Sequence, residues 1–112
     1  MENNLTWEEF ENVEMVTGTI LAVDPFPQAR KPAYQLTIDF GSKGIRRSSA
    51  QLTKLYRPDD LVGMQIVAVI NFPPKQIATF RSECLVLGAV GAEGEVTLLQ
   101  TERKTENGLR IA

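Results

Sequence analysis

One stretch near the middle of the chain constrains the fold more than any other. Between residues 34 and 40 every second residue is apolar (Tyr34, Leu36, Ile38 and Phe40), and the residues between them are Gln, Thr and Asp. This period of two predicts a strand with one face in a core and the other in water. Gly41-Ser42-Lys43-Gly44 follows as a glycine-bearing hairpin loop, so we expect a returning strand over residues 45–49.

Further segments rich in β-forming residues predict more strands. The longest covers residues 13–23, and Gly18 in its middle predicts the bend or bulge that a long strand needs to join a small barrel. The others are residues 65–70, 82–87 and 96–100, the last two separated by a glycine-rich turn. Residues 50–62 are expected to be irregular or a short helix, and residues 71–81 a proline-containing loop.

A short helix is expected over residues 6–12, ahead of the first strand. Thr6 and Glu9 have the spacing of a capping box, and acidic residues suit the first turn of a helix. Trp7 and Phe10 are spaced to share one face, and core packing is the favoured interpretation for both.

Together these elements predict an all-β fold. The expected architecture is a five-stranded OB-fold barrel with a short N-terminal helix and a small helical insertion after the third strand. Another small barrel or a sandwich remains the alternative. The 112 residues fit one domain, residues 1–112, and leave no room for two.

Two of the expected strands are apolar on both faces. Residues 66–70 and 84–87 lack the polar alternation of a strand with one wet face, so their outer faces need a cover. The candidates are the N-terminal helix, the C-terminal tail and a second copy of the chain. Because a second copy of the chain could provide this cover, we expect a homodimer.

The residue content excludes most catalytic chemistry. There is no histidine, which removes histidine-based acid–base catalysis and the common zinc sites, and the one cysteine, Cys84, lies in an apolar run. We therefore expect no enzyme activity, no metal and no cofactor. No signal peptide or membrane span is recognisable, so a cytoplasmic location without integral membrane association is expected.

Charge is unevenly distributed along the chain. The net charge is −2, yet residues 28–81 carry nine basic and three acidic residues, whereas residues 1–14 carry five acidic residues and no basic one. A basic middle of this kind can attract an anionic partner, unless its charges scatter over several faces.

Two segments combine basic, aromatic and hydrogen-bonding side chains suited to binding a macromolecule. The candidate binding residues are Asn71, Phe72, Lys75, Ile77, Phe80, Arg81 and Ser82 in one segment, Arg46, Arg47, Ser48, Ser49 and Gln51 in the other, and Phe40 on the neighbouring strand. We expect the four basic residues of this set to converge on one groove with Phe72 and Phe80 nearby.

Five segments carry a resemblance to a known family. They are Thr17-Gly18-Thr19-Ile20, Phe40-Gly41, Ser48-Ser49-Ala50-Gln51-Leu52-Thr53, the run from Val69 to Ala78, and the run from Ser82 to Gly88. In order and spacing they resemble the tRNA-binding domain family. The Pro73-Pro74 pair and the Ser-Ser-Ala-Gln segment are similar to the CsaA-type secretion chaperones within it.

The resemblance implies an OB-fold, a homodimer and no enzymatic activity. It also implies a chaperone that binds precursor or unfolded polypeptides for export, with the export ATPase SecA as a partner. The alternative is a tRNA-binding module that uses much the same surface. The candidate residues serve both ligands, so the sequence leaves this choice open.

Overall fold

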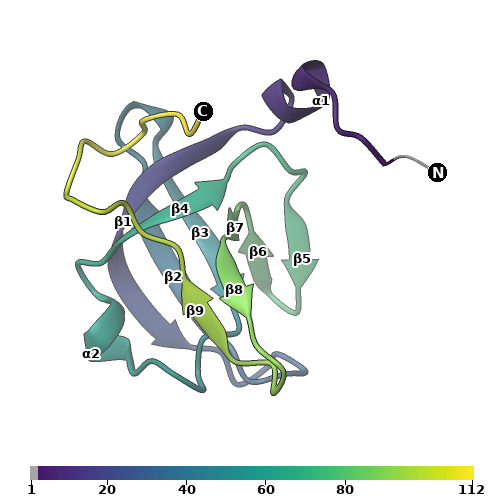
Figure 1. Ribbon diagram of the computed structural model, residues 1–112. Coiled ribbons are helices and arrows are strands. Elements are labelled where there is room, and N and C mark those ends of the chain that lie inside the picture. Colours follow the sequence, from purple (N-terminus) through teal and green to yellow (C-terminus); the bar gives the residue numbers. More distant parts are fainter. Residues whose placement is uncertain (1–2) are drawn as a thin grey trace.

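A five-stranded antiparallel sheet forms the frame of the protein (Figure 1). In the computed structural model, which describes residues 3–112, the sheet curls into a nearly closed barrel. Its strands, in spatial order, are β3 (Ile45–Ala50), β2 (Tyr34–Asp39), β1 (Met15–Pro25), β4 (Gln65–Val69) and β7 (Leu85–Val86). The expected all-β, OB-type barrel is confirmed.

Within residues 3–112, two small hairpins and three short helices complete the fold (Figure 1). The hairpins are β5 (Lys75–Ile77) with β6 (Phe80–Ser82), and β8 (Gly88–Val90) with β9 (Val96–Leu98). The helices are α1 (Trp7–Glu11), the 3-10 turn η1 (Gly41–Lys43) and α2 (Pro58–Leu61). Short helices at both predicted places are therefore confirmed.

The β2–β3 hairpin forms as its alternating pattern predicts. The register pairs Tyr34 with Ala50, and the inward-facing Leu36, Ile38 and Phe40 are fully buried. Gly41 and Gly44 have φ of 63° and 90°, values that a glycine adopts without strain.

Strand β1 curves, although its irregularity does not lie at Gly18. The register against β2 shifts between Ile20 and Ala22, which marks the bulge. Gly18 has a different role, because a Cβ there would lie 2.5 Å from Cδ1 of the Phe40 ring. The glycine lets this buried ring press against the backbone of β1.

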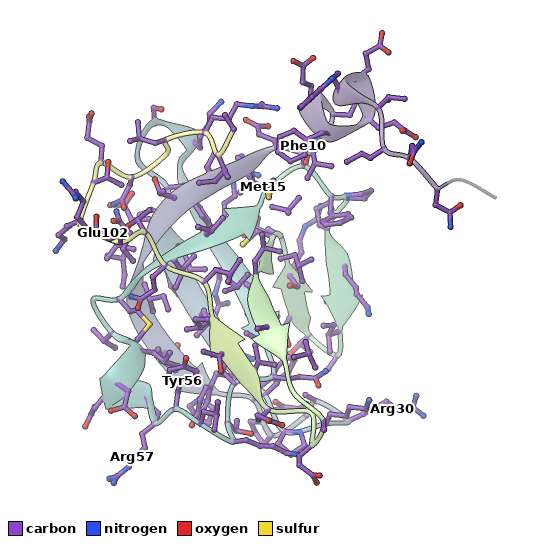
Figure 2. The ribbon with its side chains drawn as sticks, in the orientation of Figure 1. Phe10, Met15, Arg30, Tyr56, Arg57 and Glu102 are labelled. Carbon is purple, nitrogen blue, oxygen red and sulfur yellow. The ribbon has the colours of Figure 1, made fainter. Side chains whose placement is uncertain are left out.

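Helix α1 begins with the predicted capping box, but the predicted core packing of Trp7 is wrong. The Thr6 hydroxyl accepts a hydrogen bond from Glu9 N–H, and the Glu9 carboxylate accepts one from Thr6 N–H. The helix projects from the barrel (Figures 1 and 2), which leaves Trp7 86% exposed and Phe10 half-buried. Only residues 12–14 join this five-residue helix to β1, and this connection is too short for the helix to fold back onto the barrel.

The chain between residues 71 and 91 differs from the prediction. Residues 71–81, expected as a loop, contain β5 and most of β6, joined through Ala78, whose φ is 53°. The expected strand over residues 82–87 is interrupted, and the glycine-rich turn contains β8. Strands of two or three residues with mixed polarity are too short to show a period in the sequence.

The C-terminal segment contacts Gln65 of β4 and pairs with the edge of β1. The outward-facing Gln65 donates to Thr105 O (2.7 Å) and accepts from Thr105 N–H (3.0 Å). Further along, Thr17 N–H donates to Leu109 O (3.0 Å) and Ile111 N–H to the carbonyl of β1 residue Met15 (2.9 Å). All of β4 is buried within one chain, so its apolar outer face does not by itself require a second copy.

Candidate ligand groove at the seam of the barrel

The barrel closes between β3 and the segment after β6, and side chains make much of the closure. Glu83 N–H donates to Arg47 O (2.8 Å), while the Glu83 carboxylate accepts from Arg47 N–H (2.9 Å). Ser82 Oγ accepts from Ser49 N–H (3.1 Å). The edge of β3 therefore ends in satisfied hydrogen bonds as far as Ser49.

Beyond Ser49 the two sides of the seam diverge and a groove opens. Within residues 3–112, no hydrogen bond joins residues 50–52 to residues 85–90. The groove has a volume of about 830 Å³. Its walls comprise residues 49–52, part of residues 72–77, Ser82, residues 84–88, Val90, Gly94 and Val96, with Lys31 at the margin.

The groove lining is largely apolar. Two of its apolar lining residues are largely exposed, Phe72 at 54% and Leu85 at 47%. The only charged side chains among the described lining residues are Lys31 and Lys75. Such a groove suits an apolar ligand that also carries hydrogen-bonding groups.

Cys84 lies at the base of this groove as a structural thiol. It is 7% exposed, and burial raises the pKa of its thiol to about 12. Its carbonyl accepts a hydrogen bond from the buried Ser48 hydroxyl (3.0 Å). The thiol is therefore protonated at neutral pH, which removes its nucleophilic form.

The structure brings six of the predicted binding residues into the groove. They are Ser49, Gln51, Phe72, Lys75, Ile77 and Ser82. Phe40 and Ser48 are fully buried, because register places them on the inner face together with Leu36. Both were predicted to contact the ligand, but their burial makes them core residues instead.

Phe80 is also a core residue rather than a groove wall. It is 3% exposed and packs against Phe26, with ring centroids 5.2 Å apart. The Phe80 ring has a second neighbour, Arg47, whose guanidinium carbon lies 4.6 Å from the ring centre. This cation–π contact pins the β5–β6 hairpin to the outside of β3.

The predicted convergence of four basic residues on one groove is wrong. Arg46 lies at the end of the barrel, where its guanidinium donates to Ile70 O (3.0 Å). Arg47 covers Phe80, and Arg81 lies exposed on β6, outside the groove lining. Of the four, Lys75 alone lines the groove.

Other residues of the basic middle scatter over the surface. Arg30 and Arg57 extend from separate loops into solvent (Figure 2). Asn71, another predicted binding residue, holds α1 instead, because its side chain donates to Asn12 O (2.6 Å) and accepts from Glu14 N–H (3.0 Å).

Sequence reasoning missed the wall formed by residues 85–90, together with Lys31 and Leu52. A signal was present, because residues 84–87 are apolar on both faces and require a cover on each. Nothing in the sequence indicated that one of their sides borders an opening.

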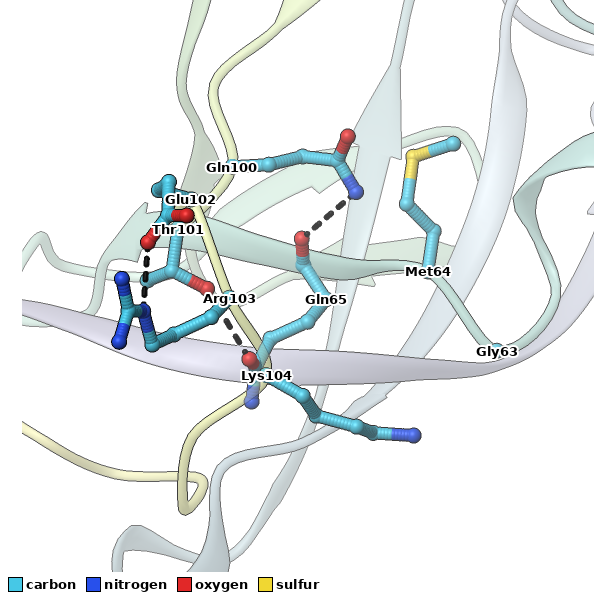
Figure 3. A pocket seen from close by; sticks show the side chains of 8 residues that line it. All are labelled: Gly63, Met64, Gln65, Gln100, Thr101, Glu102, Arg103 and Lys104. Carbon is cyan, nitrogen blue, oxygen red and sulfur yellow. Dashed lines mark hydrogen bonds and ion pairs between the residues drawn. The ribbon is translucent and has the colours of Figure 1, made fainter.

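A second, smaller hollow lies beside the C-terminal segment (Figure 3). Its volume is about 320 Å³, and residues 63–65 and 100–104 line it. Gln65 accepts two hydrogen bonds beside this hollow (Figure 3). The Gln100 side chain donates to its backbone carbonyl, and the Thr101 hydroxyl donates to its side-chain oxygen. These bonds hold the C-terminal segment in place, so we assign the hollow a structural role.

Residues 3–112 hold neither a membrane-spanning helix nor a cluster of metal-binding side chains. No helix in this part is long and apolar enough to cross a membrane. No group of three His, Cys, Asp or Glu side chains in it lies close enough together to hold a metal ion.

Comparison with solved structures finds CsaA chaperones. The chaperone CsaA of Bacillus anthracis is 49% identical, with a TM-score of 0.93 over 97% of this chain and 99% of that one. The CsaA chaperone protein of Picrophilus torridus is 46% identical, with a TM-score of 0.91 over 97% of this chain and 100% of that one. The predicted resemblance to CsaA-type proteins is confirmed.

Comparison with curated proteins finds methionine–tRNA ligases. That of Pyrococcus furiosus is 31% identical over 107 residues, which are 96% of this chain and 14% of the ligase. That of Methanococcoides burtonii is 28% identical over 107 residues, 96% of this chain and 16% of the ligase. The chain thus spans about one sixth of the length of such a ligase.

A family model described as a putative tRNA binding domain matches residues 15–110, from the first residue of β1 to the C-terminal segment. The match includes every strand of the barrel and both sides of the groove. This chain belongs to the tRNA-binding domain family.

Proposed function

We propose that the groove at the barrel seam holds an extended apolar segment of another polypeptide, and that the chain acts as a chaperone without catalytic activity. The observation that carries this proposal is the groove itself, which is apolar, about 830 Å³ in volume and bordered by the exposed Phe72. A preformed apolar groove with a few polar groups accommodates extended chains. The similarity to CsaA chaperones supports the same function.

The finer parts of the proposal concern partners and assembly. The clients are precursor or unfolded polypeptides on their way to export, with SecA as the export ATPase that receives them, in the cytoplasm. A homodimer is part of the proposal because the N-terminal region leaves Leu5 68% and Trp7 86% exposed. Light scattering should then give about twice the chain mass of 12.5 kDa, whereas a monomer at low micromolar protein would refute the dimer.

A tRNA-binding module is the second candidate. The match to the tRNA-binding domain family and the similarity to methionine–tRNA ligases support it. The exposed Lys75 and Arg81 on the β5–β6 hairpin could contact phosphates. An aromatic ring such as Phe72 in the groove lining could stack on a base.

Titration of one protein preparation with a signal-containing peptide and with unmodified tRNA separates the two candidates. Peptide binding through apolar contacts should change little with salt, whereas RNA binding should fall steeply as counterions are released. Phe72→Ala should weaken the peptide complex. We choose Phe72 rather than Phe80 because the buried Phe80 supports the hairpin, and its removal would disturb the fold.

Charge reversal on the β5–β6 hairpin is a second test that separates the two candidate functions. Lys75→Glu combined with Arg81→Glu should weaken an anionic ligand strongly, since a charge-assisted hydrogen bond contributes roughly 1.5–3 kcal/mol. Thermal stability should stay nearly unchanged, because both side chains are exposed and make no ion pair within residues 3–112. Arg57→Glu, on a distant loop, is the matched control. Loss of tRNA binding without any detectable peptide binding would make the tRNA module the better description.

A further inference from the structure

The chain from Leu85 to Gly91 is paired along one side only. Leu87 N–H donates to Val67 O of β4 (2.9 Å), and Leu87 O accepts from Leu99 N–H (3.2 Å) just after β9. Leu87 joins β7 to β8, and in an extended chain both polar groups of one residue point to the same side. Gln100, just after β9, also donates to Gln65 O at the start of β4 (3.3 Å). Strands β4 and β9 therefore lie on the same side of this segment, one after the other.

The opposite side carries unpaired backbone groups. Gly91 N–H donates to Glu95 O (2.8 Å), and with the register of β8 against β9 this places Val86, Gly88 and Val90 at the alternate positions, whose N–H and C=O groups point away from both partners. Outside the strand pairings, no backbone hydrogen bond within residues 3–112 reaches these groups. All three residues line the groove.

The facing edge of the groove is different. On β3, Arg47 and Ser49 also point their backbone groups toward the seam, but Glu83 and the Ser82 hydroxyl accept from their N–H groups. The Ser49 carbonyl accepts from the Ser48 hydroxyl (3.2 Å). The open edge of the seam is thus the one that runs from Val86 to Val90.

From this arrangement we infer that the groove recognises the main chain of its ligand, which adds as a strand to the edge formed by Val86, Gly88 and Val90. The inference rests on the proposed polypeptide-binding function and specifies its mode. The three residues present alternating donors and acceptors with a repeat of roughly 6.5–7 Å, the spacing of alternate residues in a strand. A polypeptide backbone carries matching groups at that repeat.

The ligand class follows from this geometry. Main-chain hydrogen bonds do not depend on side-chain identity, so any extended segment with unpaired backbone groups can form them. The apolar walls around Leu52, Phe72 and Ile77 then favour segments with apolar side chains at alternate positions. Unfolded chains meet both conditions, and folded ones do not.

Amide hydrogen exchange followed by NMR tests the edge directly. In the free protein, the amides of Val86, Gly88 and Val90 should exchange fast, and those of Leu87 and Gly91 slowly. Adding the signal-containing peptide should slow exchange at the first three by at least about tenfold, the factor expected when each gains a hydrogen bond of about 1.4 kcal/mol. Unchanged exchange at all three with the peptide bound overturns the inference.

Backbone methylation of the same peptide is the second test. Methylating alternate amide nitrogens of its apolar segment removes donors along one side of the added strand. One of the two alternate sets should lower affinity at least about tenfold, and the other, which faces away, by less than about twofold. Equal effects of both sets overturn strand addition in favour of side-chain pockets.

Val90 offers a matched pair of protein variants. Its side chain is 73% exposed and its N–H points away from β9, so proline is compatible with this edge position. Val90→Pro removes the edge donor, whereas Val90→Ala removes only the side chain. Val90 also lines the groove, so both variants lose its side-chain contact, and we expect clearly weaker binding for the first than for the second. Equal affinities of the two variants would contradict the inference. If Val90→Pro does not fold, the methylated peptides carry the test.

The outcomes also separate this inference from the function on which it rests. A peptide that fails to bind in its unmodified form refutes the proposed function, and strand addition falls with it. A peptide that binds, but equally well with either set of methyl groups and without slowing the three amides, refutes strand addition alone.

Discussion

The side chain of Thr17 in β1 forms two hydrogen bonds that hold the C-terminal segment against the barrel. The side chain is 1% exposed, and its hydroxyl donates to Glu106 O (2.8 Å) and accepts from Leu109 N–H (3.1 Å). Thr17→Val keeps the shape of the side chain and removes both hydrogen bonds. Each bond contributes about 1 kcal/mol, so we expect a loss of about 2 kcal/mol in the free energy of unfolding.

Urea denaturation followed by far-UV circular dichroism measures this loss. Circular dichroism is the better probe because Trp7, the only tryptophan, is 86% exposed and would report the unfolding of the barrel poorly. The midpoint should fall while the m-value stays constant, since the surface exposed on unfolding hardly changes. In a thermal scan the same loss should lower Tm by roughly 10 °C.

Thr17→Ser is the control, because it keeps the hydroxyl and removes only a methyl group. Its cost should be about 1 kcal/mol or less. The reasoning is refuted if valine is tolerated as well as serine, because the two hydrogen bonds would then contribute nothing to holding the C-terminal segment.

Four further predictions concern three single residues. Ala78→Gly should raise the free energy of unfolding by roughly 1 kcal/mol in the same urea assay, since φ of 53° strains a residue with a Cβ; a neutral or destabilising result would show that no strain is relieved. Gly18→Ala should lower it by roughly 1–3 kcal/mol, because the new Cβ would lie 2.5 Å from the Phe40 ring, and an unchanged midpoint would mean that the ring moves freely. Cys84 should resist iodoacetamide at pH 8 until the chain unfolds, as its thiol has a pKa of about 12, and fast labelling of folded protein would contradict this. The same shift predicts that stability falls as pH rises above 9.0, where the unfolded chain releases the thiol proton and the folded chain retains it.

The elements predictable from sequence were those whose pattern is set by one wet and one dry face. Residues 34–40 alternate because β2 borders both the core and solvent, and the capping box at Thr6 is a local contact. The β5–β6 hairpin was not predictable, since three residues a side show no period. The exposure of Trp7 depends on the direction in which α1 leaves the barrel, which no local pattern encodes.

The candidate site was predictable in part for the same reason. Phe40 shares the inward parity of Leu36 and Ile38, so its burial followed from the pattern that predicted its strand. The burial of Phe80 did not, because it depends on Phe26, more than fifty residues away in sequence. The open edge from Val86 to Val90 exists because β4 and β9 pair on the same side, which is a property of the topology alone.

The pairing of Val16 with Arg110 joins positions near opposite ends of the chain. During synthesis β1 leaves the ribosome early, yet its neighbour beyond Val16 does not exist until residues 109–111 have been added. The hydrogen bonds between Gln65 and residues 101–107 likewise cannot form until those residues have been synthesised. Contacts of such long sequence separation slow folding. The barrel should therefore reach its final form only after residues 101–111 have been synthesised, and until then Gln65 and the edge of β1 lack these partners.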